Sequence, residues 1–401
     1  MNYLVIGCGP GSMGEAIAYR LLSEKNTRVF ITDQNPQNIA MTMIKLRQLC
    51  RRYQSECDDL KPFYGPGLDI MRDKVLLPHL FEKFDVVVSA VPASLNPIIA
   101  EAVVRSNRYR AENAPKTHYC DLGGILEVTK KLIHWDMDQQ AKNCGVSIVP
   151  DCGLQPGLGN IIAIDILKKF DPDIPVESIV IYVGGLPYNY SAPPFYKKLF
   201  NLKGLAEIYY NAPLVLHKGR PLKISKLSHY ETISTREFDL FFGSPDIIKF
   251  EAAVTGGLGA LPYYLRDQVT TLREKTLRFV GHFGAVKKMP PEKFESIFSK
   301  WLDNFPVQEK DFIVMKVEAV GKSAIRNERI KVEKLLYVES DENWNAMQKT
   351  TGFTTAVIAK LIAEGKALPG AMPPEIALDP SVVLDALRKD FKIYERATPL
   401  K

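Results

Sequence analysis

Residues 3–18 of the 401-residue chain read YLVIGCGPGSMGEAIA. The short apolar run Tyr3–Ile6 is typical of a buried parallel strand, and a cluster of glycines follows it directly. Residues Glu15–Leu22 then have the apolar spacing of a helix. A strand, a glycine-rich turn and a helix in this order are what a dinucleotide-binding loop requires. The stretch therefore predicts the start of a Rossmann-type α/β domain.

The glycines fit the pattern G-x-G-x-x-G in more than one frame. Gly9, Gly11 and Gly14 match it directly, whereas a second frame starts at Gly7 and lengthens the loop before Gly14. In either frame the glycines permit a tight turn, close approach of the backbone to a pyrophosphate, and phosphates at the helix N-terminus. Which glycine faces the phosphates stays open. The predicted cofactor loop consists of Gly7, Gly9, Gly11, Ser12, Met13 and Gly14.

An acidic residue follows the second predicted strand. Thr27–Thr32 is apolar and β-branched, and it ends at Asp33, nineteen residues beyond Gly14. A carboxylate in this position can accept both hydroxyls of an adenine ribose. The next residues, 34–36, include no Arg or Lys for a 2′-phosphate, so NAD is favoured over NADP. The alternative is that Asp33 only caps the helix that follows.

Three later apolar runs are also expected to be strands that end at this edge of the sheet. They are Phe84–Pro92, Thr117–Asp121 and Val146–Val149. In a doubly wound sheet, ligands bind beyond the carboxyl ends of the strands. The residues expected to line the cofactor at these ends are Ala90, Val91, Pro92 and Leu122.

Two of these strands carry aspartates towards the same edge. Asp121 ends one run, and Asp151 follows the next. Two carboxylates in one cleft can act as acid and base, because burial or mutual repulsion raises the pKa of one towards neutrality. The alternative for each is that it caps the helix after it.

The composition of the chain changes after Asp151. Residues 188–300 carry many Tyr, Phe and Pro and few helical periods, as expected of a mixed, largely antiparallel domain. Asp311–Val320 and Arg329–Val338 predict a hairpin that could extend a sheet or a subunit interface. The C-terminal part is helical again, which predicts that it returns to pack on the first domain.

Charge and composition exclude some classes of protein. The net charge of +6 is spread thinly, with no dense basic block, so no nucleic-acid partner is expected. No apolar run approaches the roughly 20 residues of a membrane span. The first strand begins at Tyr3 and leaves no room for a signal peptide. We therefore expect a soluble protein with no membrane partner.

The cysteines support the same expectation. The six are scattered, without C-x-x-C pairs or a metal-ligand spacing with histidine. They are predicted to be reduced thiols in the cytoplasm, and they argue against a metal site.

Eight segments, in their order and spacing, resemble the saccharopine dehydrogenase family, and within it the lysine 6-dehydrogenase branch. They are Met13–Ala18, Val87–Pro92, Tyr119–Gly124, Val149–Gly157, Val183–Pro187, Lys275–His282, Thr350–Phe353 and Pro373–Glu375. The resemblance implies a discontinuous Rossmann-type NAD-binding domain, residues 1–122 plus 345–401. It also implies an inserted α+β substrate-binding and dimerisation domain, residues 123–344, and a homodimer or higher homo-oligomer.

The resemblance also implies a reaction. The terminal amine of L-lysine, or of a similar ω-amino acid, would be oxidised by NAD through an imine to the aldehyde, with release of ammonia. An alkylammonium with a pKa near 10.4 must first lose a proton, so the reaction needs a base. Within this resemblance the expected acid/base set is Asp121, Asp151 and His282, with Cys152 as a relay. The alternative for His282 is a structural histidine.

Two residues are candidates for substrate binding. Arg278 could clamp the carboxylate of an amino acid in a bidentate fork, or it could form a surface ion pair with Glu274. Tyr188, which follows Gly184–Pro187, could hydrogen-bond the substrate or only pack.

Two other functions stay open. One is a saccharopine- or carboxyspermidine-type dehydrogenase that joins an amine to an aldehyde acid with NAD(P)H. Asp33 weighs against it, because reductive biosynthesis usually draws on NADPH. The other is a non-enzymatic protein that senses nicotinamide dinucleotides. The presence of Asp121, Asp151, Arg278 and His282 in one chain disfavours it.

Overall fold

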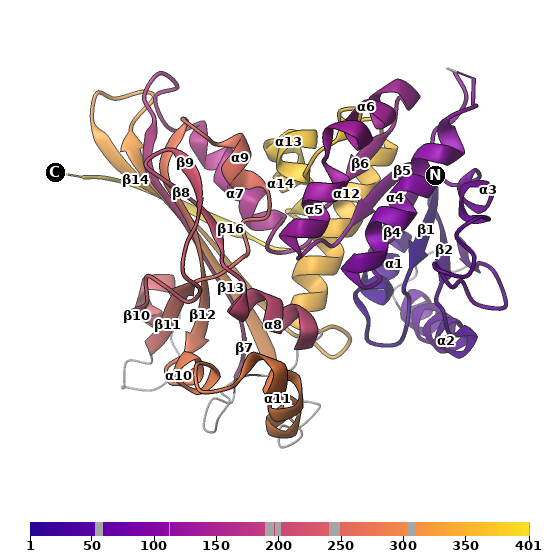
Figure 1. The fold of residues 1–401 in the computed structure, drawn as a ribbon, viewed down its shortest axis with the longest axis horizontal. Coiled ribbons are helices and arrows are strands. Elements are labelled where there is room, and N and C mark those ends of the chain that lie inside the picture. Colours follow the sequence, from indigo (N-terminus) through magenta and orange to yellow (C-terminus); the bar gives the residue numbers. More distant parts are fainter. Residues whose placement is uncertain are drawn as a thin grey trace. The chain divides into compact units, whose positions relative to one another are not determined.

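The computed structural model describes residues 1–52, 59–111, 113–188, 196, 202–239, 249–302 and 310–400. The chain divides into two compact units (Figure 1). Unit 1 comprises Met1–Leu158 and Gln348–Leu387, and unit 2 comprises Gly159–Met347 and Arg388–Lys401.

Unit 1 is built on a seven-stranded parallel sheet with the strand order β15-β6-β5-β4-β1-β2-β3. Its strands are β1 (Asn2–Ile6), β2 (Arg28–Thr32), β3 (Leu60–Pro62), β4 (Val86–Ser89), β5 (His118–Asp121), β6 (Ser147–Val149) and β15 (Gly370–Ala371). The order 3-2-1-4-5-6 is that of a Rossmann fold. Successive strands are added on one side of β1 up to β3 and on its other side from β4 onwards, so the topological switch point lies between β1 and β4. The predicted α/β class with a Rossmann-type domain is confirmed.

Helices cover both faces of this sheet. They are α1 (Met13–Leu22), α2 (Pro36–Arg52), α3 (Leu77–Phe81), η2 (Ala93–Leu95), α4 (Asn96–Asn107), α5 (Leu126–Leu132), α6 (Trp135–Cys144), η5 (Gln348–Phe353), α12 (Thr354–Ala363), α13 (Pro374–Ala377) and α14 (Pro380–Leu387). The contacts of α12 with α1, β4 and β5 place the C-terminal segment inside this unit, as the sequence predicted.

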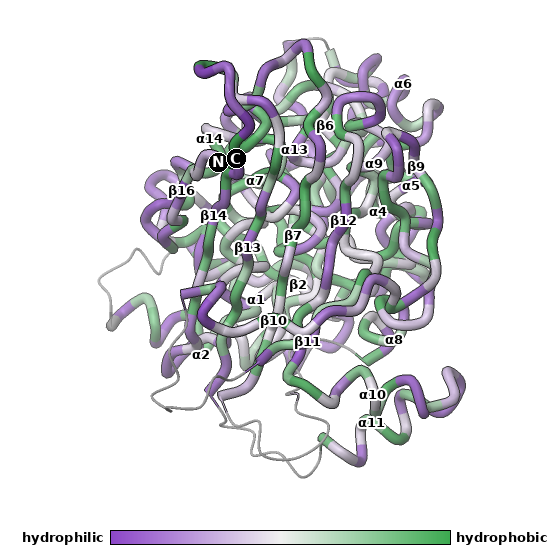
Figure 2. The backbone as a smooth tube through the Cα atoms, turned by 90° about the vertical axis from the view of Figure 1, so that its left-hand side faces the viewer, coloured by the Kyte–Doolittle hydropathy of each residue, from purple (hydrophilic) through white to green (hydrophobic). Residues whose placement is uncertain are grey.

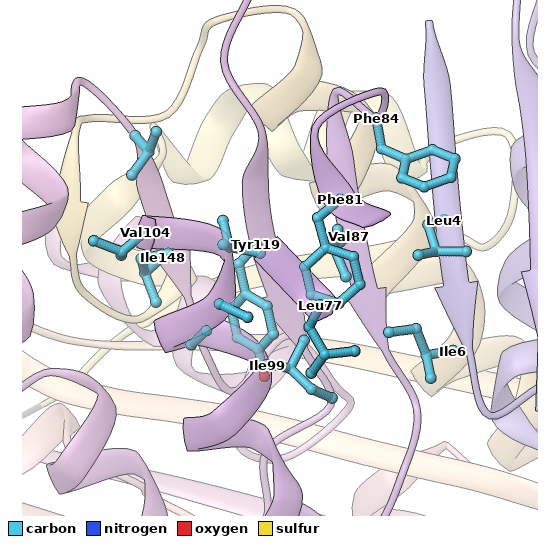
Figure 3. Close-up of a cluster of buried hydrophobic side chains, with 14 of the residues drawn as sticks. Leu4, Ile6, Leu77, Phe81, Phe84, Val87, Ile99, Val104, Tyr119 and Ile148 are labelled. Atoms are coloured by element: carbon cyan, nitrogen blue, oxygen red, sulfur yellow. The ribbon is translucent and has the colours of Figure 1, made fainter. Parts of the chain in front are cut away.

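The core under α3 and α4 follows from the alternation of side chains along the strands. Leu4 and Ile6 of β1 pack with Val87 of β4 and Tyr119 of β5, and each is at most 1% exposed (Figure 3). Phe81 of α3 closes the cluster from the helix layer. Complete burial of such a side chain stabilises the fold by about 1.5–3 kcal/mol. This packing holds the carboxyl ends of the strands at one edge.

Unit 2 contains a nine-stranded sheet with the path β10-β11-β12-β7-β13-β14-β16, to which β8 and β9 attach at β12. Its strands are β7 (Val176–Pro187), β8 (Leu214–His217), β9 (Arg220–Lys223), β10 (Glu231–Ser234), β11 (Lys249–Val254), β12 (Val269–Phe279), β13 (Asp311–Lys322), β14 (Arg329–Glu339) and β16 (Ile393–Pro399). Among the described strands of unit 2, only β7 and β12 pair in parallel, so the expected mixed, largely antiparallel domain is confirmed. Figure 2 shows β7 mainly in the colours of apolar residues, as expected of a central strand.

The helices of unit 2 are short. They are α7 (Leu158–Leu167), α8 (Leu202–Tyr210), η3 (Thr235–Phe238), α9 (Leu261–Tyr264), α10 (His282–Val286), η4 (Pro291–Lys293) and α11 (Phe294–Leu302).

The predicted hairpin is confirmed, because β13 and β14 pair in antiparallel register from Phe312–Glu339 to Lys322–Arg329. β13 lies between β7 and β14 within the sheet rather than at its edge.

The division of the chain differs from the predicted one at two places. Residues 123–158 belong to unit 1, because β6 continues the parallel sheet beside β5. Residues 388–401 belong to unit 2, because β16 pairs with β14. Both differences arise from strand pairing between distant segments, which the local sequence pattern does not encode.

Three further features concern only the described residues. None of their helices is both long and apolar enough to span a membrane. No group of three or more of their His, Cys, Asp and Glu side chains is arranged to hold a metal ion. The cysteines among them are free thiols, and Cys57 lies outside the described residues.

Candidate active site

The glycine loop between β1 and α1 leaves no room for side chains at two positions. Gly7 has a φ of +91°, and a Cβ there would lie 2.7 Å from the carbonyl oxygen of Ala90. A Cβ at Gly14 would lie 2.5 Å from the carbonyl oxygen of Gly7. Gly7 is therefore the turn glycine and Gly14 the helix-packing glycine, which favours the frame that starts at Gly7. Gly11 has a φ of +73° but open space around it.

Side chains hold the loop from several directions. Thr42 of α2 donates to the carbonyl of Cys8 at 2.9 Å, and Ser12 donates to the carbonyl of Gly7 at 3.0 Å. Ser12 is also the N-cap of α1, because its hydroxyl accepts from the N–H of Glu15 at 3.2 Å. Met13 is the first residue of the helix. The loop is thus fixed before any ligand binds, as an anion-binding helix N-terminus requires.

Asp33 forms local contacts of the kind that its capping role predicts, and it also lies beside the glycine loop. Its Oδ1 accepts from the N–H of Asn35 and from Nδ2 of Asn38, each at 2.9 Å. Its Oδ2 would lie 3.6 Å from a Cβ on Gly9, so the carboxylate also stands beside the glycine loop. Asn38, which the sequence analysis missed, holds Asp33 in this position.

The ends of β4 and β5 also lie as expected at this edge. The backbone of Ala90 and Val91 adjoins Gly7, within 3.2 Å of its Cβ position. Pro92 is exposed, and Leu122 is half-buried after β5. These residues are accessible enough to line a bound cofactor.

The carboxylate of Asp121 is wholly buried and fully engaged. Tyr119 donates its hydroxyl to Oδ2 at 2.8 Å, and the N–H of Gly123 donates to Oδ1 at 2.7 Å. Burial raises the pKa of Asp121 to about 6, although the hydrogen bonds from Tyr119, Asp151 and Gly123 oppose this. These contacts order the loop after β5.

Asp151 lies against Asp121, as expected from the strand ends. Its N–H donates to Oδ1 of Asp121 at 3.2 Å, and its carboxylate accepts from the hydroxyl of Thr129 at 2.9 and 3.0 Å. Its backbone is left-handed, with a φ of +65°. Burial, followed by repulsion from Asp121, raises the pKa of Asp151 to about 7. Burial thus raises the pKa values of both carboxyls towards neutrality.

Cys152, the predicted relay, is a buried thiol directly after Asp151. Its thiol donates to the carbonyl of Val149 at 3.2 Å and is wholly buried. Burial raises the pKa of Cys152 well above its usual value, so the thiol keeps its proton at neutral pH. The role of Cys152 as a proton relay stays a prediction.

In unit 2, Arg278 is the centre of a second group of polar side chains. It is only 4% exposed, Nε donates to the hydroxyl of Tyr209 at 2.7 Å, and Nη1 donates to the carbonyl of Leu277 at 2.7 Å. The guanidinium also lies 4.9 Å from the ring centre of Tyr196. The alternative of a surface ion pair with Glu274 is wrong, because Glu274 is itself buried and accepts from Thr255 and Thr276.

His282 joins the same group. It is the first residue of α10, directly after Gly281 with a φ of +104°. Its Nε2 lies 2.9 Å from the hydroxyl of Tyr209. Tyr209 also accepts from Nε of Arg278, so its hydroxyl links the guanidinium to the imidazole.

Tyr188 lies apart from Arg278 and His282. It packs on the cluster that contains Leu277 and Phe279, the two neighbours of Arg278 on β12. Because side chains alternate along a strand, Arg278 projects from the opposite face of the sheet. The Tyr188 hydroxyl instead bonds Tyr337 and Glu339, each at 2.5 Å. The two predicted substrate contacts therefore do not share one face.

Two residues of this group were missed by the sequence analysis. Tyr209 lies on α8, 69 residues before Arg278. Glu251 pairs in register with Arg278, and its carboxylate accepts from the N–H groups of Gly281 and Phe283. Glu251 thus fixes the turn that precedes His282. No local pattern marks either residue, because the role of Glu251 depends on strand register and that of Tyr209 on a contact between α8 and β12.

Comparisons with known proteins place these features in a wider context. The family model described as the saccharopine dehydrogenase C-terminal domain matches residues 153–393. The mitochondrial alpha-aminoadipic semialdehyde synthase of Rattus norvegicus is 30% identical over 112 residues, which are 28% of this chain and 11% of that protein. The Arabidopsis thaliana synthase is 24% identical over 223 residues, which are 53% of this chain and 19% of that protein. The chain thus spans less than a fifth of these relatives.

Among solved structures, apo saccharopine dehydrogenase (L-Glu forming) from Saccharomyces cerevisiae superposes with a TM-score of 0.69. The match covers 100% of both chains at 15% sequence identity. At this identity the likeness establishes the fold.

Proposed function

Because the chain belongs to the saccharopine dehydrogenase family, we propose that it is an oxidoreductase that uses a nicotinamide dinucleotide on the CH–NH or CH–NH2 group of an amino acid. The observation that carries the proposal is the loop between β1 and α1. Gly7 and Gly14 admit no side chain there, and the carboxylate of Asp33 stands beside Gly9. This combination fits a dinucleotide-binding loop.

NAD is the proposed cofactor. The first N–H groups of α1 would hold its pyrophosphate, and Asp33 would accept the hydroxyls of the adenine ribose. Residues Ala90–Pro92 and Leu122 would line the rest of the dinucleotide. When bound, the nicotinamide supplies the hydride acceptor, and the protein orients it.

Arg278 is proposed to bind the carboxylate of the amino acid. It is a buried cation, and no described carboxylate lies within ion-pair distance of it. Buried charges are normally paired, and a guanidinium matches a carboxylate in a fork geometry. Tyr209 and Tyr196 would hold the guanidinium in place.

Asp151 is proposed to handle the proton of the amine. A base for this step works best with a pKa near the operating pH, and the pKa of Asp151 is about 7. The neighbouring carboxylate of Asp121 would help to keep the pKa of Asp151 raised. His282, whose Nε2 is hydrogen-bonded to the hydroxyl of Tyr209, is proposed to act on the substrate through Tyr209 and Arg278.

Two classes of substrate are candidates. The terminal amine of L-lysine, or of a similar ω-amino acid, is the first, since Asp33 favours NAD and hence oxidation. The second is a saccharopine-type substrate formed from an amine and an aldehyde acid with NAD(P)H. The names of the aminoadipic semialdehyde synthases and of the saccharopine dehydrogenase that the chain resembles favour this second substrate.

A homo-oligomer in the cytoplasm is proposed in either case, and light scattering of the purified protein would test the oligomer.

The deciding experiment measures NADH formation at 340 nm with purified protein, NAD and either L-lysine, L-ornithine, a diamine or saccharopine. Turnover with lysine and release of ammonia support the first substrate. Activity with saccharopine alone, or NADPH consumption with an amine and an aldehyde acid, supports the second. Binding of NADH without turnover of any amine would favour a sensor protein over an enzyme.

A further inference from the structure

The C-terminal segment of unit 1 reaches the glycine loop through one buried amide. Gln348, the first residue of the π-helical turn η5, is 4% exposed. Its Nε2 donates to the carbonyl of Gly11 at 3.0 Å and to the carbonyl of Ser12 at 3.3 Å. A residue more than 300 positions away thus holds two carbonyls of the loop.

The same turn packs closely on the first part of α1. A Cβ on Gly352 would lie 2.8 Å from the Cβ of Ala16 and 3.4 Å from the carbonyl oxygen of Met13. The ring of Phe353 lies 6.3 Å from that of Tyr19. Gly352 therefore permits the approach that brings Gln348 to the loop.

The continuation of the turn contacts the loop after β6. Thr355 of α12 donates to the carbonyl of Cys152 at 2.9 Å. The methyl group of Thr351 lies 3.4 Å from the Cβ position of Gly153. One segment, residues 348–355, thus supports both the glycine loop and the loop that carries Asp151.

The hydrogen bonds of Gln348 fix the direction of an N–H group. A trans peptide is planar, so its carbonyl and its N–H point in opposite directions. Holding the carbonyl of Ser12 therefore orients the N–H of Met13. Met13 is the first residue of α1, and its N–H is among those that a helix offers to an anion.

We propose that Gln348 is a positioning residue for the dinucleotide, resting on the proposed function. It orients the peptide between Ser12 and Met13 so that the helix N-terminus faces the pyrophosphate. Gly352 is part of the same device because it seats the π-helical turn against α1. π-helical turns occur frequently at functional sites, which agrees with this role.

The test is a titration of NADH, followed by fluorescence, with the full chain carrying Gln348→Met. This change keeps the length of the side chain and removes its donor. We expect the Kd for NADH to rise about tenfold, as for the loss of one oriented hydrogen bond. The thermal midpoint of the free protein is measured in parallel.

The matched control is Asn107→Leu, which removes a buried amide at the opposite end of the sheet. Asn107 is 2% exposed and donates to the carbonyls of Val103 and Thr117 at 2.7 and 2.9 Å. We expect it to lower the thermal midpoint without changing the Kd for NADH. If Asn107→Leu and Gln348→Met weaken binding equally, the effect is general destabilisation and the inference is overturned.

Gly352→Ala is a second variant that leaves the hydrogen-bonding groups intact. It should raise the Kd by a few fold, because the added methyl group meets Ala16 and moves the turn. Unchanged Kd values in both Gln348→Met and Gly352→Ala, with a wild type that binds NADH, would overturn this inference alone. A wild-type protein that binds neither NADH nor NADPH would instead overturn the proposed function.

Discussion

The glycine loop of unit 1 is shaped by backbone atoms that leave no room for a side chain, whereas the surroundings of Arg278 in unit 2 are shaped mainly by contacts between side chains. A Cβ on Gly14 would meet the carbonyl of Gly7, and one on Gly7 would meet the carbonyl of Ala90. Arg278 is held by the hydroxyl of Tyr209 and the ring of Tyr196. The first region is therefore fixed by steric exclusion, and the second by hydrogen bonds and ring contacts.

This difference determines what each region tolerates. Steric exclusion leaves no substitute for a glycine, since neighbouring backbone atoms cannot move without moving a strand. A hydrogen-bonded cluster loses the free energy of the bonds removed and of any buried group left without a partner, which is a bounded cost. Substitutions of the tightly packed glycines should therefore abolish dinucleotide binding, whereas substitutions around Arg278 should weaken amino-acid binding only in part.

The largest effect is expected from Gly14→Ala. Its methyl group would lie 2.5 Å from the carbonyl oxygen of Gly7, so α1 must shift away from β1. We expect NADH binding to weaken on the order of a thousandfold, about 4 kcal/mol. Calorimetric titration of NADH measures this loss.

Gly11→Ala is the control for this change. Gly11 also has a positive φ, but no atom lies within 4 Å of its Cβ position. Only the backbone strain of about 1–2 kcal/mol remains. If Gly11→Ala and Gly14→Ala weakened NADH binding equally, backbone strain rather than packing would control the loop.

The second prediction concerns pH and Asp151. The pKa of Asp151 rises from 3.8 to about 7 on folding, so between these values the unfolded chain releases a proton that the folded protein keeps. The free energy of unfolding therefore falls as the pH rises from about 4 to about 7, and levels off above that. Asp151→Asn should remove this loss and be more stable at pH 8 by a few kcal/mol, on the order of 1.4 per unit of pKa shift.

Urea unfolding at pH 4.5 and pH 8 measures the difference. Asn suits this position, since it also adopts the left-handed backbone that Asp151 has. Asp173→Asn, at an exposed aspartate, removes the same charge and should leave the pH dependence unchanged. Equal slopes for wild type and Asp151→Asn would show that Asp151 ionises normally in the folded protein.

The third prediction sharpens the assignment of the cofactor. Asp33→Arg removes the acceptor beside Gly9 and offers a cation to a 2′-phosphate. We expect NADH to bind about thirtyfold more weakly, a loss of about 2 kcal/mol, and NADPH to bind better than it does to wild type. Parallel titrations with the two dinucleotides test this. Unchanged NADH affinity would show that Asp33 only holds Asn35 and Asn38.

The sequence predicted the glycine loop better than it predicted the surroundings of Arg278. The glycines and Asp33 follow strand signals within a few residues, so local pattern locates them. The position of Tyr188 relative to Arg278 depends on the pairing of β7 with β12, in which Val183 meets Thr276. Tyr209, Glu251 and Gln348 also act on residues at least 30 positions away. Such contacts depend on register and on the return of the chain, which periodicity does not report.

The smallest effect is expected from Tyr209→Phe. The change removes the hydroxyl that links Arg278 to His282 and leaves the ring in place. Unfolding should become easier by about 1–2 kcal/mol, because the buried Nε–H of Arg278 loses its acceptor. Binding of the amino acid should weaken while binding of NADH is unchanged, which calorimetry resolves. Tyr188→Phe, on the other face of the sheet, is the matched control. If Tyr188→Phe weakens amino-acid binding and Tyr209→Phe does not, the substrate side of unit 2 is the Tyr188 face.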